Sequence, residues 1–225
     1  MIPLHDLERT RHPAVVTRLL LLAIAAVWVY TLTLLDRPAA LASFYDRWSF
    51  DWARLVAQLR AGDMDAMTFL PLFTHQFLHA GWLHVLGNTL YLWIFGDNVE
   101  DRLGSGRMLL LYLASGALAA VGQGLVAAGP MVGASGAIAA VLGAYLVLSP
   151  GARVRTLVFL GIFITVVTLP AIFVIGLWLV VQVLSGAALM RIGAHEATAN
   201  VAYAAHVTGF VSGFVFAVLS HPRRR

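Results

Sequence analysis

The sequence has no cysteine and no lysine, and it has few charged residues of any kind. Without cysteine, disulfides, thiolate metal sites and a cysteine nucleophile are all excluded. Only 12% of the 225 residues are charged, whereas 60% are hydrophobic and the mean hydropathy is +0.83. Soluble domains carry about 25% charged residues, so the composition predicts an all-α, polytopic membrane protein.

All 15 basic residues are arginines, and their positions follow the hydrophobic runs. Cytoplasmic loops of membrane proteins are enriched in arginine and lysine. An orientation with both termini in the cytoplasm, including the tails 1–14 and 221–225, gathers most of the arginines on that side. We therefore interpret the positive charge as an orientation signal and expect no nucleic-acid partner. The arginines of the inner segments are Arg9, Arg11, Arg18, Arg102, Arg107, Arg153, Arg155, Arg223, Arg224 and Arg225.

Residues 1–225 are expected to form one membrane domain with six spans. The N-terminus shows no signal-peptide pattern, so its first apolar run is expected to be retained. Tryptophan mixed with arginine in the first outer loop, 36–70, predicts an interfacial segment with an amphipathic helix; a small extramembrane cap is the alternative. The apolar run 156–168 is interpreted as partly interfacial. The predicted spans are 15–35, 71–95, 108–128, 135–148, 170–185 and 201–220.

The run that begins at Ser135 is too short to cross a bilayer by itself. A full span needs about 20 residues, but this one ends at Ser149-Pro150. If it reaches one face of the membrane, Ser135 lies below the other face. A hydroxyl at a glycine-flanked helix start inside the membrane either helps neighbouring helices to pack or takes part in chemistry.

Three polar side chains fall at one depth in this topology. His84, Ser135 and His206 each lie near the start of a span that runs from the outside to the inside. Small residues, Gly209 and Gly213, follow His206 at helical spacing, and the serine helix has a similar stripe, so the two helices can approach closely. A serine needs an adjacent base to become a nucleophile, and His206 is the candidate.

His84 and Asn88 lie four residues apart and share one face of the second span. Both side chains can donate N–H groups, which an oxyanion site requires, and the amide of Ser135 at its helix start is a third candidate donor. The alternative is that these groups only bond one another within the bundle. Polar residues in membrane spans are costly and usually functional, so their convergence favours catalysis.

Three motifs resemble the rhomboid family of intramembrane serine proteases. They are Phe77–Asn88 (FLHAGWLHVLGN), Gly133–Gly136 (GASG) and Ala205–Gly209 (AHVTG), in the family's order and spacing. The resemblance implies a six-helix rhomboid-like bundle and a serine endopeptidase that cleaves transmembrane segments of membrane proteins without a cofactor. It assigns the nucleophile to Ser135, the general base to His206, oxyanion stabilisation to His84 and Asn88, and the lining of the site to His79, Gly133 and Gly136.

The resemblance also implies the partners of the protein, which are the lipid bilayer and transmembrane protein substrates. The arginine pattern predicts an active site toward the outer side, and the short tails without a transit peptide favour a bacterial cytoplasmic membrane. The chain departs from the family in two places, and one of them bears on His206. The sequence carries no signal for an oligomeric state. Some family members have a tyrosine one turn after the serine that stacks on the histidine, whereas this chain has Ala139. The sequence therefore names no residue that holds His206.

Two other functions remain open. His84 and His206, on separate helices, are candidate ligands for haem or a metal, although no His-Glu-x-x-His motif is present and Ser135 and Asn88 would then have no role. A rhomboid-like protein that binds membrane clients without cutting them is the second alternative. Such proteins lack the serine or the histidine, and this chain keeps both.

Overall fold

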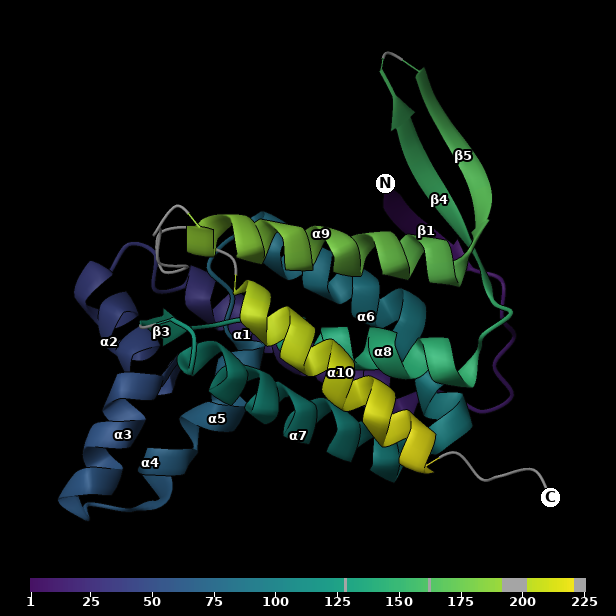
Figure 1. Cartoon of the computed structure of the whole chain (residues 1–225). Helices are drawn as coiled ribbons and strands as arrows, with labels where there is room; N and C mark the ends of the chain where they lie inside the picture. The colour runs from purple at the N-terminus through teal and green to yellow at the C-terminus, as the bar shows by residue number, and fades with distance from the viewer. Residues whose placement is uncertain (128, 162, 192–201, 221–225) are drawn as a thin grey trace.

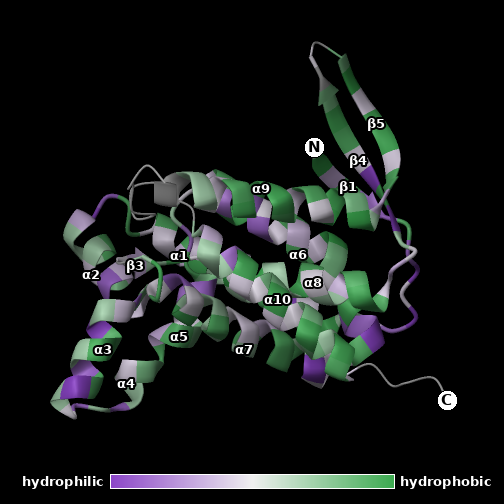
Figure 2. Ribbon diagram, in the orientation of Figure 1, coloured by the Kyte–Doolittle hydropathy of each residue, from purple (hydrophilic) through white to green (hydrophobic). Residues whose placement is uncertain are grey.

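The computed structural model describes residues 1–127, 129–161, 163–191 and 202–220 (Figure 1). Six helices form a bundle, and α8 lies at its centre, with every residue from Gly136 to Tyr145 buried. Figure 2 shows hydrophobic residues along most of their length. The six helices are α1 (Val15–Leu32), α6 (Trp82–Leu103), α7 (Ser105–Gly124), α8 (Ser135–Leu148), α9 (Ala171–Arg191) and α10 (Tyr203–Ser220).

Four of these helices are long and apolar enough to cross a membrane. They are α1, α7, α10 and the Ala171–Ala188 part of α9, whereas α8 is apolar but only 14 residues long. Helix α6 has 22 residues, but polar groups such as His84, Asn88 and Asp97 interrupt its apolar sequence. The mainly helical membrane bundle is confirmed, and the number of six spans stays a prediction.

The second predicted span, 71–95, is wrong as a single helix. The chain forms two short helices, α5 (Pro71–Thr74) and the 3-10 helix η1 (His75–Phe77), and then extends at Leu78 before α6 begins at Trp82. Gly81 precedes α6 in an extended conformation. The hydropathy of the sequence does not reveal this break, because the residues on both sides of it are apolar.

The segment 36–70, predicted as the first outer loop, folds into short helices at the end of the bundle where α8 begins. They are α2 (Pro38–Trp48), α3 (Trp52–Ala61) and α4 (Ala66–Phe69). Strand β2 (Phe50–Asp51) pairs with β3 (Pro130–Met131), four residues before α8. Two hydrogen bonds fasten α2 to the chain before α6: Tyr45 Oη donates to the carbonyl of His79 at 2.7 Å, and Thr74 Oγ1 donates to the carbonyl of Trp48 at 2.8 Å.

A β-hairpin corrects the all-α expectation and forms most of the apolar run 156–168. Strands β4 (Arg153–Leu160) and β5 (Phe163–Pro170) pair in antiparallel register, and β1 (Ile2–Asp6) pairs with β4 at the base of the hairpin. The hairpin precedes the first turn of α9 and projects away from the bundle (Figure 1). Its sequence is rich in β-branched residues, which favour strands, and Gly161 in the turn has a φ of +62°. Its place at the membrane surface stays a prediction.

Glu100 fastens α1 to the turn between α6 and α7. Its carboxylate accepts hydrogen bonds from the backbone N–H groups of Val16 and Thr17 at 2.9 and 2.7 Å, from Thr17 Oγ1 at 2.8 Å and from Ser105 Oγ at 2.6 Å. Glu100 is only 2% exposed. A carboxylate at a helix N-terminus satisfies orphan amides and is favoured by the helix dipole, so α1, α6 and α7 meet at this side chain.

We expect Glu100→Ala to lower the free energy of unfolding by about 3 kcal/mol, because buried donors lose a charged acceptor. The measurement is thermal or denaturant unfolding in detergent. The matched control is Glu8→Ala, which removes only the more exposed ion pair with Arg102, whose atoms are 3.4 Å apart; surface pairs contribute at most about 1 kcal/mol. Equal effects of the two changes would contradict this assignment.

Asp6 anchors β1 to the interior of the bundle. Its Oδ2 accepts hydrogen bonds from Tyr145 Oη at 2.7 Å and from Asn98 Nδ2 at 2.6 Å, and the residue is 4% exposed. Burial raises the pKa of Asp6 to about 6; the hydrogen bond from Tyr145 opposes this rise, and the charge of Asp97 adds to it. The folded protein therefore holds a proton on Asp6 more tightly than the unfolded chain does.

This pKa predicts a pH-dependent stability. A carboxyl whose pKa is raised on folding contributes stability that is fully present below its unfolded pKa, about 4, and is lost as the pH rises through about 6. We expect wild-type protein to lose on the order of 2 kcal/mol more than Asp6→Asn between about pH 4 and pH 7, since asparagine keeps an oxygen acceptor but does not titrate. Unfolding followed across this range measures it; parallel curves would refute it.

Candidate active site

Helices α8 and α10 cross with their backbones in contact. A Cβ added to Gly209 would overlap the carbonyl oxygen of Gly136, and one added to Gly213 would overlap Ala140. One added to Gly143 would overlap the carbonyl oxygen of Phe210. Small residues allow this approach, and the small-residue stripes of the two sequences therefore face each other, as predicted.

This crossing brings the ends that carry Ser135 and His206 together. Ser135 directly precedes Gly136, and His206 directly follows Ala205, whose carbonyl oxygen lies 3.7 Å from a Cβ built on Gly136. Ser135 is the first residue of α8 and is partly exposed, while His206 lies in the first turn of α10 and is 8% exposed. The start of α8, with the partly exposed Ser135, thus lies beside the first turn of α10, which carries the buried His206.

The His206 ring is held by two residues of α9. Its Nδ1 lies 2.7 Å from Gln182 Oε1, and the Trp178 ring lies with its centroid 5.5 Å away at an interplanar angle of 40°. Neither residue is among those expected from the sequence. The available signal is Gln182 itself, an amide inside an otherwise apolar span, with Trp178 one turn earlier on the same face.

His84 and Asn88 of α6 lie against the loop that precedes Ser135. A Cβ built on Gly133 would lie 2.6 Å from His84 Nε2 and 3.8 Å from Asn88 Nδ2. Gly133 has a φ of +122°, which favours glycine, so this position needs glycine for both its conformation and its neighbours. The structure therefore brings His84, Asn88 and Gly133 together beside the start of α8.

Asn88 is buried, and within the described part of the chain its Nδ2 has no hydrogen-bond partner. Buried donors are usually paired, and an unpaired one calls for an explanation. This donor lies next to the loop that precedes Ser135.

His79 lies behind His84 and extends this group. The two rings lie 5.0 Å apart, edge to face, and the carbonyl of His79 is the one that Tyr45 binds. The ring of His75 points elsewhere and contacts Phe50. Only its backbone reaches this group, where its carbonyl accepts a hydrogen bond from the N–H of Gly133 at 2.8 Å. Among the described residues, no three histidine, aspartate or glutamate side chains are grouped as metal ligands.

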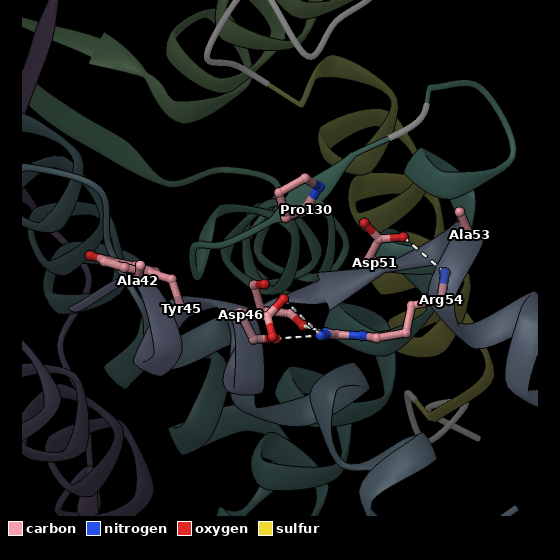
Figure 3. A pocket seen from close by; sticks show the side chains of 8 residues that line it. Ala42, Tyr45, Asp46, Asp51, Ala53, Arg54 and Pro130 are labelled. Carbon is pink, nitrogen blue, oxygen red and sulfur yellow. Dashed lines mark hydrogen bonds and ion pairs between the residues drawn. The ribbon is translucent and has the colours of Figure 1, made fainter. Parts of the chain in front are cut away.

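A pocket of about 620 Å³ opens between α2 and α3, beside Pro130 of β3 (Figure 3). Arg54 lies in it, and its Nη2 donates to the carbonyl of Ser49 at 2.6 Å while its Nη1 bonds Asp46. None of the seven residues predicted for the site lines this pocket. The guanidinium is occupied in holding α2 and α3 together, so its role is structural.

Comparison with known proteins shows the family of this chain. The sequence profile described as Rhomboid domain matches residues 66–223. The chain belongs to the rhomboid family. Its six-helix bundle, with the short α8 enclosed, is therefore a rhomboid membrane domain, and the protein is an integral membrane protein.

Two curated relatives show how far the similarity extends. The rhomboid protease GluP of Bacillus subtilis (strain 168) is 33% identical over 143 residues, which are 64% of this chain and 24% of GluP. The rhomboid protease GlpG of Yersinia pestis (strain Pestoides F) is 31% identical over 101 residues, which are 39% of this chain and 36% of GlpG. The rhomboid chain thus spans about a quarter to a third of the length of these relatives.

The crossing of α8 and α10 predicts a sharp effect of single methyl groups. We expect Gly209→Ala to destabilise the protein by about 3 kcal/mol or more, because the new Cβ meets backbone that no side-chain rotation can move. Gly176→Ala on α9 is the matched control, since nothing lies within 4 Å of its added Cβ. Thermal unfolding of both variants in detergent measures the difference; a Gly209→Ala protein as stable as Gly176→Ala would contradict the close approach.

Proposed function

We propose that this chain is an intramembrane serine endopeptidase with Ser135 as nucleophile and His206 as general base. The observation that carries the proposal is the crossing of α8 and α10, which brings the first residue of one helix to the first turn of the other. A serine hydroxyl becomes nucleophilic when an adjacent base takes its proton, and a Ser–His pair without a carboxylate is a reduced form of the familiar triad.

The reaction proceeds in two halves. Ser135 Oγ attacks the carbonyl carbon of the scissile peptide, and His206 Nε2 takes the hydroxyl proton. The tetrahedral intermediate collapses, the C–N bond breaks, and His206 returns the proton to the leaving amine, which leaves an acyl-enzyme. A water molecule then attacks the ester with His206 again as base, and the acid product and free Ser135 are released.

The oxyanion is stabilised by donors from α6 and α8. Asn88 Nδ2, which has no partner among the described residues, and His84 Nε2 both lie at Gly133, two residues before the nucleophile. The backbone N–H of Ser135 adds a donor at the positive end of α8. Donors that are already oriented cost no reorganisation during the reaction, and Gly133 keeps the space beside His84 and Asn88 free of a side chain.

The substrates are transmembrane segments of other membrane proteins. A peptide bond inside a helix is shielded, so the segment has to unwind locally before Ser135 can reach it. Unwinding in lipid exposes unpaired amides, and segments with weak helix propensity near the cut are therefore preferred. We place six spans in a bacterial cytoplasmic membrane, both ends in the cytoplasm and the active site toward the outer side, because that orientation fits the arginines.

The test is cleavage of a transmembrane substrate by detergent-purified protein, with a chelator present throughout. We expect Ser135→Ala and His206→Ala each to lower the rate at least about 10³-fold, as loss of a group that acts in a catalytic unit does. Ser212→Ala is the matched control, because the Ser212 hydroxyl bonds only the carbonyl of Gly209 in its own helix, at 2.8 Å, among the described residues.

Labelling with a fluorophosphonate, which reacts with activated serines, gives a second readout that needs no substrate. Wild type and Ser212→Ala are expected to be labelled, whereas Ser135→Ala is not. Cleavage that survives Ser135→Ala overturns the proposal. Wild-type protein that retains a transmembrane client but neither cuts it nor reacts with the label supports client binding instead.

A further inference from the structure

The strongest unexplained feature of the bundle is Gln182, a buried amide within α9. It is 8% exposed, and the residues around it in α9 are almost all apolar. A polar side chain inside a membrane helix is costly and is kept where it has a specific partner. The partner is the imidazole of His206, whose Nδ1 lies 2.7 Å from Gln182 Oε1.

We propose that Gln182 is a positioning residue that sets the tautomer and orientation of the His206 ring; this rests on the proposed role of His206 as general base. A carboxamide oxygen only accepts hydrogen bonds, so the Nδ1 that it binds carries the proton. In a neutral imidazole the other nitrogen, Nε2, then has a free lone pair. That is the nitrogen that has to take the proton of Ser135.

Two contacts from α9 constrain the His206 ring in two directions. The hydrogen bond from Nδ1 fixes rotation in the ring plane, while Trp178, one helical turn before Gln182, lies against the ring at a centroid distance of 5.5 Å. The turn after Ser135 gives no such support, because it holds Ala139, a buried residue with a single methyl group. The ring of the base is therefore held from α9 rather than from the nucleophile's own helix.

The same role is filled by a carboxylate in a Ser–His–Asp triad, where the third group orients the imidazole and favours one tautomer. A neutral amide orients the ring but adds no negative charge. This suits a site within the membrane, because a buried carboxylate would need its own compensating charge.

The experiment compares Gln182→Met, which keeps the length of the side chain but removes the acceptor, with Val181→Met at the neighbouring, lipid-exposed position of α9. The first readout is the tautomer of His206 in ¹⁵N-histidine-labelled protein, with its signals assigned by comparison with His206→Ala. We expect wild type and Val181→Met to hold the proton on Nδ1 and Gln182→Met to populate both tautomers. The second readout is kcat, expected to fall about 10- to 100-fold in Gln182→Met with KM changed less than about threefold.

Three results would overturn the inference. A proton on Nε2 in wild type would mean that the Gln182 amide donates rather than accepts. An unchanged kcat in Gln182→Met would mean that the contact is dispensable, and a lower kcat with an unchanged tautomer would mean that Gln182 only stabilises the bundle. The tautomer needs no substrate, so it is measurable even if Ser135→Ala still cleaves, the result that would overturn the proposed protease function instead.

Discussion

The backbone contact between α8 and α10 is the constraint on which the rest of this structure depends. Within a bilayer, helices gain little from the hydrophobic effect when they associate, and close packing of small residues replaces it. Gly143, Gly209 and Gly213 remove the side chains that would keep the two backbones apart. The same contact determines the candidate chemistry, because Ser135 and His206 are neighbours of the residues that touch. Helix packing and the candidate chemistry therefore depend on the same glycines.

Helix α8 is also too short to cross a bilayer by itself. Fourteen residues rise about 21 Å, which is less than the roughly 30 Å of a hydrocarbon core. In the predicted topology the loop around Gly133 fills the missing length, and irregular backbone inside a membrane is tolerated only where protein covers it. The structure supplies such a cover: β2 of the segment 36–70 pairs with β3, and the carbonyl of His75 accepts a hydrogen bond from the N–H of Gly133. The outer helices thus support the loop that presents the candidate nucleophile.

How much of this could be predicted depends on the kind of signal. The facing stripes of α8 and α10 and the shared face of His84 and Asn88 follow from helical spacing, which a sequence displays directly. The hairpin of β4 and β5 does not, because an apolar run of that length is compatible with either structure, and only its β-branched residues favour strands. The break before Trp82 is hidden because apolar residues flank it. Gln182 is visible as an anomaly, but its partner is 24 residues away on another helix, and only the fold identifies it.

The polar groups of the candidate site fall into two kinds. The imidazole of His206 and the amide of Gln182 satisfy each other, so the cost of burying them is largely offset and their geometry is fixed. Asn88 Nδ2 is buried without a partner among the described residues, although an amide in such a place normally finds one. Under the proposed function, the first pair holds the base in one orientation before a substrate arrives. The second group is then a donor free for an oxyanion, so that its hydrogen bond forms only when charge develops, which is where a catalyst gains most from it.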